Sequence, residues 1–106
     1  MTNLLEPISP GEILMEEYLI PLKLSQNQLA RDIDVPVRRV NEIIRGHRSI
    51  TADTALRLAY YFETSPELWL GLQNAYDLRC AKRKLGDQIV RRVHTYQESH
   101  AHCPGH

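Results

Sequence analysis

Two short helical patterns meet at Asp34, inside the stretch LARDIDVPVRRVNEIIRG from Leu29 to Gly46. Apolar residues recur at helical spacing on both sides, and the first pattern stops at the aspartate. Two helices this short can share a buried face only if they cross closely, so the elbow between them admits few residue types. The stretch therefore predicts a pair of helices joined by a tight turn of fixed geometry.

The residues of this elbow satisfy that geometry. Ala30 is the small residue that a close helix crossing needs, and Asp34 lies at the turn position that adopts a positive φ. Glycine takes that conformation without steric cost, but Asp is among the few other residues that visit it. Two short helices of an ordinary bundle would show similar apolar spacings, so the pattern alone leaves that alternative open. The predicted buried set is Leu29, Ile33, Val35, Val40 and Ile43.

Helix start and stop signals recur along the chain, and no stretch shows sustained strand alternation. We therefore predict an all-α fold. Its helices begin with Pro10-Gly11, with the capping-box residues Ser25 and Gln28, with Pro36, with Thr51 and with Ser65-Pro66, and three of them end at Pro21, Gly46 and Phe62.

The helix that begins at Ser65 is predicted to continue far along the chain. An apolar stripe keeps near-helical spacing within it, although Gly86 is a candidate break. The stripe has no obvious partner within one chain, which favours a homodimer. A chain of 106 residues, 42% of them hydrophobic, suits one compact domain. We assign residues 9–78 to that domain, 79–93 to a C-terminal helical extension and 94–106 to a flexible tail; the stripe comprises Leu72, Leu78, Ala81, Leu85, Ile89 and Val93.

The second helix of the pair carries a polar face suited to DNA. In a helix-turn-helix the first helix crosses the phosphate backbone and the second enters the major groove. Arg can bond guanine with two donors, Asn can bond adenine in the same way, and Glu can accept from cytosine. We predict base contacts from Arg38, Asn41 and Arg45, and phosphate contacts from Gln26, Asn27 and the helix start near Thr51. The full predicted DNA-binding set is Gln26, Asn27, Pro36, Val37, Arg38, Arg39, Asn41, Glu42, Arg45, Arg48 and Thr51.

A longer run of sequence resembles a known family. Between Ser9 and Leu78 the chain contains PGE, LSQ, NEIIRG, ITADTALRLA and TSPELWLGLQ, and together these pieces closely resemble the HigA antitoxins, also named virulence-associated protein I. That family is a branch of the Xre/Cro-like helix-turn-helix proteins, with a five-helix lambda-repressor-like domain. Two features depart from its pattern: Asp34 in the turn and the segment after Leu85.

The resemblance implies a homodimeric repressor encoded beside a small toxin. Such an antitoxin binds and inhibits a HigB/RelE-like mRNA-cleaving toxin and represses their shared promoter, which implies a palindromic double-stranded DNA operator. Glu12, Glu16 and Glu17 lie with Glu6 in an N-terminal segment that lacks Lys and Arg, and form the expected docking site for a basic toxin. The alternative for these glutamates is that they only solubilise the first helix. The alternative for the function is a stand-alone Xre-family transcriptional regulator without a toxin partner.

Other residue patterns favour binding over catalysis. The sequence has no glycine-rich phosphate loop and no histidine beside a plausible nucleophile in a structured segment, so we expect neither enzymatic activity nor a cofactor. Trp69 lies among Leu and aromatic residues at a spacing that fits core or dimer packing better than a ligand groove. A C-terminal set lacks the spacing of a zinc site, and we expect no metal there: His94, His100, His102, Cys103 and His106. A basic set fits a solvated face, a DNA contact or a toxin contact: Arg79, Lys82, Arg83 and Lys84.

Charge and hydropathy indicate the cellular location of the protein and the partners that it can have. The 13 basic and 13 acidic residues cancel, whereas nucleic-acid-binding domains are more often basic, so a positive DNA-binding surface must be local. Apolar runs such as IPL and LWLGL are too short to cross a bilayer, and the N-terminus lacks the basic start and apolar region of a signal peptide. The two cysteines form no CxxC motif. We expect a cytoplasmic protein with no membrane partner.

Overall fold

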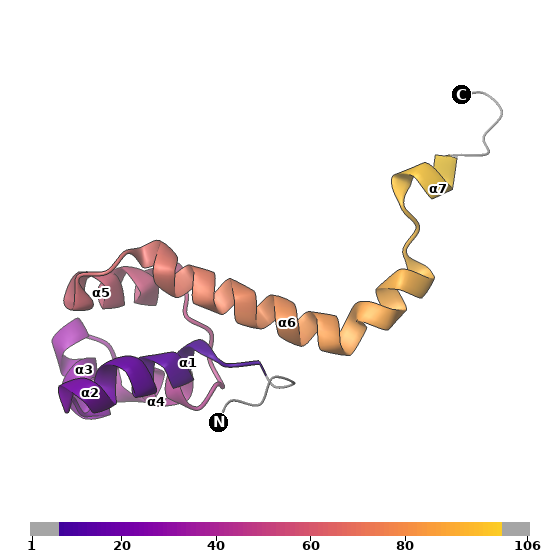
Figure 1. The fold of residues 1–106 in the computed structure, drawn as a ribbon. Helices are drawn as coiled ribbons and strands as arrows, with labels where there is room; N and C mark the ends of the chain where they lie inside the picture. The colour runs from indigo at the N-terminus through magenta and orange to yellow at the C-terminus, as the bar shows by residue number, and fades with distance from the viewer. Residues whose placement is uncertain (1–6, 101–106) are drawn as a thin grey trace.

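The computed structural model describes residues 7–100, and that range contains helices and no strand (Figure 1). The first helical rod consists of three consecutive elements, α1 (Pro10–Ile13), η1 (Leu14–Leu19) and α2 (Ile20–Leu22). It is followed by α3 (Gln26–Ile33), α4 (Val37–Ile44), α5 (Ala52–Phe62), α6 (Pro66–Arg92) and the short α7 (Tyr96–His100). The predicted all-α fold is confirmed. None of the described helices combines the length and the apolar composition that a membrane span requires.

The first rod begins with a reciprocal cap and passes through a proline. The Ser9 hydroxyl accepts from the Glu12 N–H at 3.2 Å, and the Glu12 carboxylate accepts from the Ser9 N–H at 3.5 Å. The sequence predicted an end at Pro21, but the proline lies inside the rod, which ends one residue later. Pro21 has no N–H to donate to the preceding turn. That turn is the π-helix η1, in which the N–H of Ile20 bonds the carbonyl of Met15, and this wider turn carries the helix across the proline.

The hydrophobic core draws on the first rod, α3, α4, α5 and the start of α6, and Trp69 of α6 lies at its centre with no exposed surface. The indole Nε1 donates to the Thr64 hydroxyl at 2.9 Å, and the rings of Tyr18 and Phe62 lie 5.0 and 6.2 Å from the indole, centroid to centroid. Trp69 is therefore a core residue and does not line a ligand groove. The other buried apolar residues are Leu14, Leu19, Leu29, Ala30, Ile33, Val40, Ile43, Ile50, Ala55, Leu58 and Ala59.

α1 crosses the C-terminal end of α4 at a distance that only glycine permits. A Cβ atom added to Gly11 would lie 1.9 Å from the backbone carbonyl oxygen of Ile43. Real carbon and oxygen atoms do not approach so closely, so any side chain at this position would push the two helices apart. The PGE segment thus positions α4 by backbone contact.

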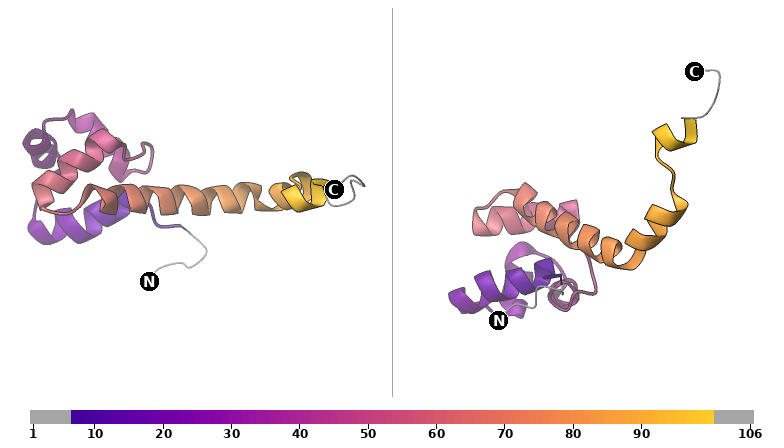
Figure 2. Two further views of the ribbon diagram at one scale, coloured as in Figure 1. Left: turned by 90° about the horizontal axis from the view of Figure 1, so that it is seen from above. Right: turned by 45° about the vertical axis from the view of Figure 1, so that its right-hand side comes forward.

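α6 leaves the domain after its first turns. Its N-terminal part packs against α5, whereas the rest extends away from the other helices (Figures 1 and 2). Leu72 packs against the core, so its inclusion in the unpaired stripe was wrong. The stripe begins at Leu78 and its large apolar members are exposed. Gly86 does not end the helix, although α6 bends in its C-terminal third (Figure 1).

A short capped helix follows α6. The Thr95 hydroxyl accepts from the N–H of Glu98 at 2.9 Å, and the Glu98 carboxylate accepts from the N–H of Thr95 at 3.1 Å. The sequence predicted no regular structure here, because the signal is a single capping pair without an apolar stripe behind it. The last residues of the predicted tail, 101–106, lie outside the described range.

Candidate nucleic-acid interface

α3, a tight turn and α4 form the predicted helix-turn-helix. Ala30 is 2% exposed, and Asp34 adopts the left-handed conformation with φ 60° and ψ 53°. The N–H of Val35 donates to the Ala30 carbonyl at 3.0 Å, which closes the C-terminal end of α3. Both expectations for the elbow are confirmed, and four of the five predicted core residues are buried, with Val35 packed partly against them.

A side chain from α5 fastens this turn. The Nη1 of Arg57 donates to the backbone carbonyls of Ile33 at 2.8 Å and Asp34 at 3.0 Å. Its Nε bonds Asp53 at 3.1 Å, and the other carboxylate oxygen of Asp53 accepts from Arg39 of α4 at 2.7 Å. The turn, α5 and α4 are therefore joined by one chain of charged hydrogen bonds.

This network was missed by the sequence analysis. The only local signal was the i,i+4 spacing of Asp53 and Arg57, which is common on helix surfaces. The hydrogen bonds from Arg57, and then from Arg39, hold the pKa of Asp53 below its ordinary value. Arg39 was predicted to contact DNA, but its side chain is only 28% exposed and is directed to Asp53. Arg39 is thus a structural link between α4 and α5.

The exposed face of α4 presents the residues predicted to read bases. Val37 is 39% exposed and the Arg38 side chain is 84% exposed. Arg45 follows the last residue of α4, is exposed, and its guanidinium makes no hydrogen bond to any described residue. Pro36 precedes the helix as its N-cap, with extended backbone dihedral angles. The start and one side of α4 are therefore accessible to a partner whose groove is wide enough for a helix.

Glu42 lies between two arginines on this face. Its Oε2 accepts from the Nε of Arg38 at 3.0 Å, and its Oε1 accepts from the Nε of Arg48 at 2.8 Å and forms an ion pair with the Nη2 of Arg48 at 2.8 Å. The hydrogen bond from Arg48, and to a lesser extent that from Arg38, holds the pKa of Glu42 below its ordinary value, so the carboxylate is charged at neutral pH. Sequence analysis placed all three residues on the interface but did not anticipate that they pair.

Polar residues of α3 lie beside α4. The side-chain amide of Asn41 donates to the side-chain oxygen of Gln26, so two predicted DNA contacts from different helices are joined. Asn27 is exposed in the first turn of α3, which Ser25 caps with a bond of 3.0 Å to the Gln28 N–H. The Gln28 side chain bonds Asp32 instead of completing the capping box predicted there.

The N-terminal ends of two helices, α3 and α5, lie beside α4 at the candidate interface. Thr51 is the N-cap residue of α5, but its hydroxyl makes no capping bond and remains exposed. The starts of α3 and α5 carry unpaired N–H groups and the positive end of the helix dipole, which favours anions such as phosphate. The structure does not test any individual DNA contact, so the predicted set stays a prediction.

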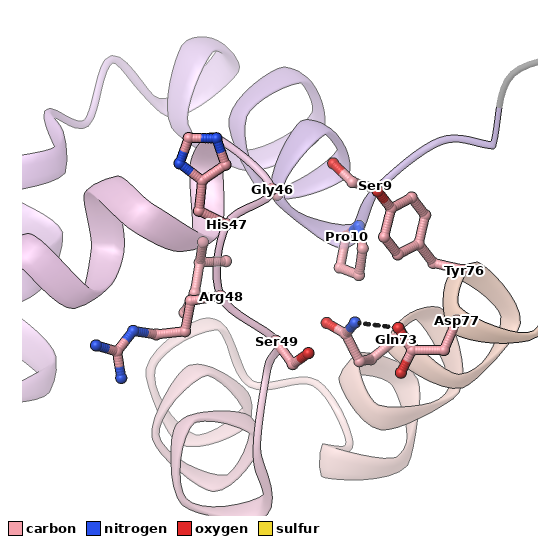
Figure 3. A pocket seen from close by; sticks show the side chains of 11 residues that line it. Ser9, Pro10, Gly46, His47, Arg48, Ser49, Gln73, Tyr76 and Asp77 are labelled. Atoms are coloured by element: carbon pink, nitrogen blue, oxygen red, sulfur yellow. Dashed lines mark hydrogen bonds between the residues drawn. The ribbon is translucent and has the colours of Figure 1, made fainter. Parts of the chain in front are cut away.

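A polar hollow of about 220 Å³ lies behind α4, between Ser9, the loop from Gly46 to Ser49, and α6 (Figure 3). Gln73 is 7% exposed at its base; its Oε1 accepts from the N–H of Ile50 at 2.8 Å, and its Nε2 donates to Asp77 at 2.9 Å. The Arg48 side chain points out of the hollow, away from Gln73 (Figure 3). Gln73 therefore anchors the loop from which Arg48 reaches Glu42.

The three glutamates predicted to bind a toxin occupy the first rod. Glu12 takes part in the cap with Ser9, whereas Glu16 and Glu17 of η1 are exposed without a side-chain bond to any described residue. Glu6 lies outside the described range, as do three members of the His/Cys set, His102, Cys103 and His106. The docking site stays a prediction, and within it Glu12 already has a local structural role.

Comparison with known proteins gives a consistent result. Residues 15–69 match the family model described as Helix-turn-helix (HTH_3). Virulence-associated protein I of Dichelobacter nodosus is 52% identical over 81 residues, which cover 76% of this chain and 75% of that protein. An addiction module antidote protein of the HigA family from Coxiella burnetii has a structure with a TM-score of 0.82 and 54% identity, covering 86% of this chain and 99% of the other. The Pseudomonas aeruginosa antitoxin HigA, whose structure was solved with the higBA promoter, has a TM-score of 0.83 and 42% identity over the same shares.

Proposed function

The chain belongs to the helix-turn-helix family, in the Xre-like branch that includes the HigA antitoxins, and on this premise we propose that it is an antitoxin that represses its own operon and inhibits a RelE-like mRNA-cleaving toxin. The observation that carries the DNA-binding part is the turn at Asp34, which Arg57 fastens so that α4 projects with its polar face open. The likeness to a HigA antitoxin whose structure was solved with a promoter supports it. A repressor acts where the chromosome is, in the cytoplasm.

In this proposal α4 enters the major groove and reads bases. Arg38, Asn41 and Arg45 supply the donors that guanine and adenine accept, and Val37 supplies an apolar contact for a thymine methyl group. Gln26 orients Asn41 through their shared hydrogen bond. Asn27 and Thr51 lie at two helix starts and bind the phosphates on either side of the groove.

The proposed DNA-bound form is a homodimer on a palindromic operator. A two-fold axis places two copies of α4 about 34 Å apart, or a multiple of that distance, so that each reads one half-site. The apolar stripe of α6 beyond Leu78 is the surface proposed to join the copies, because its members Leu85 and Ile89 are 43% and 49% exposed in the single chain. A dimer also doubles the positive contacts available to a chain of zero net charge.

The toxin is proposed to bind away from α4, on the acidic first rod. Opposite charge would steer a basic RNA-binding protein to Glu16 and Glu17 and orient it there. The recognition face would stay free, so repression would persist with the toxin bound. A stand-alone regulator would have the same DNA-binding face and no toxin partner.

One experiment tests the DNA part of the proposal. The promoter fragment upstream of the gene and a scrambled fragment of equal length and composition are titrated with the protein at several salt concentrations. Specific recognition predicts that the promoter fragment binds at least about 10³-fold more tightly than the scrambled one at physiological salt. Equal affinity for the two fragments would contradict the repressor assignment.

Co-expression tests the toxin part. We expect the product of the adjacent reading frame to arrest growth alone and to be harmless together with this chain. A neighbour that is harmless alone, or lethal in both cases, would leave only the stand-alone regulator. Once protection is established, Glu16→Lys with Glu17→Lys tests the docking site without touching the cap formed by Glu12. Glu63→Lys with Glu67→Lys is the matched control, because both residues are also exposed and make no side-chain bond to a described residue.

A further inference from the structure

Two arginines beside the exposed face of α4 already have a hydrogen-bond partner within the chain. Arg38 and Arg48 share one partner, Glu42, whose two carboxylate oxygens each accept from a different guanidinium. Glu42 comes from the middle of α4, Arg38 from one turn earlier, and Arg48 from the loop that follows. The side chain of Glu42 is 25% exposed, against 84% for Arg38, so the acid lies lower on the surface than the arginine that it holds.

The atoms used in these bonds determine what each arginine can still do. A guanidinium has five N–H donors in one plane. Arg38 gives only Nε to Glu42, so both of its terminal nitrogens remain available. Arg48 donates its Nε and places its Nη2 at ion-pair distance, so among the described residues its Nη1 has no carboxylate partner. Each arginine is therefore held by its side edge and presents its end to solvent.

Such restraint opposes binding to DNA of arbitrary sequence. A free arginine has many rotamers and can follow a phosphate wherever the backbone places it. An arginine held by its Nε edge reaches only a small region above the helix, and the carboxylate beneath it cancels one of two positive charges. Phosphates of any sequence lose attraction, whereas a base at the right position meets a donor pair that is already oriented.

We propose that Glu42 is a specificity-determining residue that reads no base itself and acts by holding Arg38 and Arg48 in fixed orientations. The inference rests on the proposed DNA-binding function. It differs from the role first predicted for Glu42, acceptance of a hydrogen bond from cytosine, because each of its oxygens already accepts from an arginine of the same chain.

Glu42→Gln tests the proposal, with Glu67→Gln as a control that changes the net charge equally. Affinities of both variants and of the unchanged protein are measured for the promoter fragment and for its scrambled counterpart, across a range of salt concentrations. We expect Glu42→Gln to bind the scrambled fragment more tightly, with a salt slope steeper by up to about 0.9 for one added phosphate contact. We expect the ratio of the two affinities to fall about tenfold, the size of one misplaced base contact.

The outcomes distinguish failure of the proposed DNA-binding function from failure of the role proposed for Glu42. If the unchanged protein does not distinguish the fragments, the proposed function fails. If it does, and Glu42→Gln has the same affinity ratio as Glu67→Gln, charge alone matters and the orienting role is overturned. Loss of promoter binding without a gain on the scrambled fragment would show that Glu42 contacts DNA, which also overturns it. NMR of the arginine Nε–H groups gives a reading independent of DNA: ordered, exchange-protected signals for Arg38 and Arg48 are expected, and Glu42→Gln should abolish that protection.

Discussion

The guanidinium of Arg57 donates a hydrogen bond of 3.0 Å to the backbone carbonyl of Asp34, so a side chain of α5 closes the turn between α3 and α4. The carbonyls at the C-terminal end of a helix lack donors within the helix and carry the negative end of its dipole. A cation at this end supplies the missing hydrogen-bond donor and also interacts favourably with the negative end of the dipole. The left-handed conformation of Asp34 directs its carbonyl to that cation, and the helix-turn-helix angle is thereby tied to α5 as well as to the core.

Replacement of Arg57 should therefore weaken the fold. We expect Arg57→Ala to lower the free energy of unfolding by about 1–3 kcal/mol, because two backbone carbonyls lose a charged donor and Asp53 loses one of its two partners. Urea unfolding followed by circular dichroism measures the change. Arg31→Ala is the control, since the Arg31 side chain makes only one hydrogen bond to a described residue, an exposed one to the side chain of Gln28. Equal losses in the two variants would show that the turn does not depend on Arg57.

Two glycines should respond in opposite ways to the same substitution. Gly11→Ala places a methyl group against the Ile43 carbonyl, and we expect a loss of about 3 kcal/mol or more, the upper range of overpacking. Gly71→Ala lies inside α6 with no atom within 4 Å of the added group, and should gain about 0.5–1 kcal/mol from helix propensity. Thermal unfolding of both variants checks the pair. A stable Gly11→Ala protein would contradict the close crossing of α1 and α4.

The contribution of Asp53 should depend on pH. Arg57 and Arg39 lower its pKa in the folded protein below the ordinary value of 3.8. The resulting stability is present above about pH 3.8 and is lost as the pH falls through the lower folded pKa. We expect Asp53→Asn to be less stable than the unchanged protein at pH 7 and equally stable below the folded pKa. Unfolding curves of both proteins between pH 7 and 2 test this, and a difference that persists at pH 2 would assign it to the amide substitution itself.

Base and phosphate contacts should separate by their sequence dependence. We expect Arg38→Ala to cost about 1–3 kcal/mol on the promoter fragment and to relax the preference at one base position. Asn27→Ala should weaken binding to all sequences alike. Competition titrations with single-base variants of the promoter fragment measure both effects. Unchanged promoter affinity in Arg38→Ala would make the exposed face of α4 ordinary protein surface.

The oligomeric state can be measured directly. Light scattering at micromolar concentration should give about twice the 12.3 kDa of one chain, because the stripe of α6 is exposed in a monomer. Leu85→Glu with Ile89→Glu should yield a monomer, whereas Lys84→Gln, between the stripe positions, should leave the dimer intact. A single 12.3 kDa species for the unchanged protein would remove the dimer from the proposal.

Local signals in the sequence predicted the helices well. Ser25 and Ser65 are N-cap residues whose hydroxyls accept from the N–H three residues later. Asp34 adopts the positive φ that the spacing around it requires. Such features depend on a few neighbouring residues, so they are visible in the chain itself. The predicted helix end at Pro21 was wrong because that prediction also used only the local signal. A proline usually ends a helix, and only the wider turn before it explains why this helix continues.

Contacts between distant segments were not predictable. Arg57 and the Asp34 carbonyl are 23 residues apart, and so are the Gln73 side chain and the Ile50 N–H. No periodicity links such positions, because each depends on how two helices lie after folding. The same limit applied to the candidate site. Sequence analysis placed Glu42 on the polar face of α4, but its position between two arginines follows from where the loop after α4 returns.

Because of the π turn η1, each half of the first rod can direct its own face toward the rest of the domain, as two separate helices would. Its N-terminal half holds Gly11 against α4, and its C-terminal half holds Leu19 in the core. A π turn contains one residue more than an α turn, so it is equivalent to an insertion that the fold has absorbed. Deleting an exposed residue such as Glu16 would restore an ordinary α turn and leave both contacts in register, whereas the same deletion in α3 would rotate all later residues by about 100°. The length of the first rod can therefore drift by one residue in evolution while the recognition helix keeps its place.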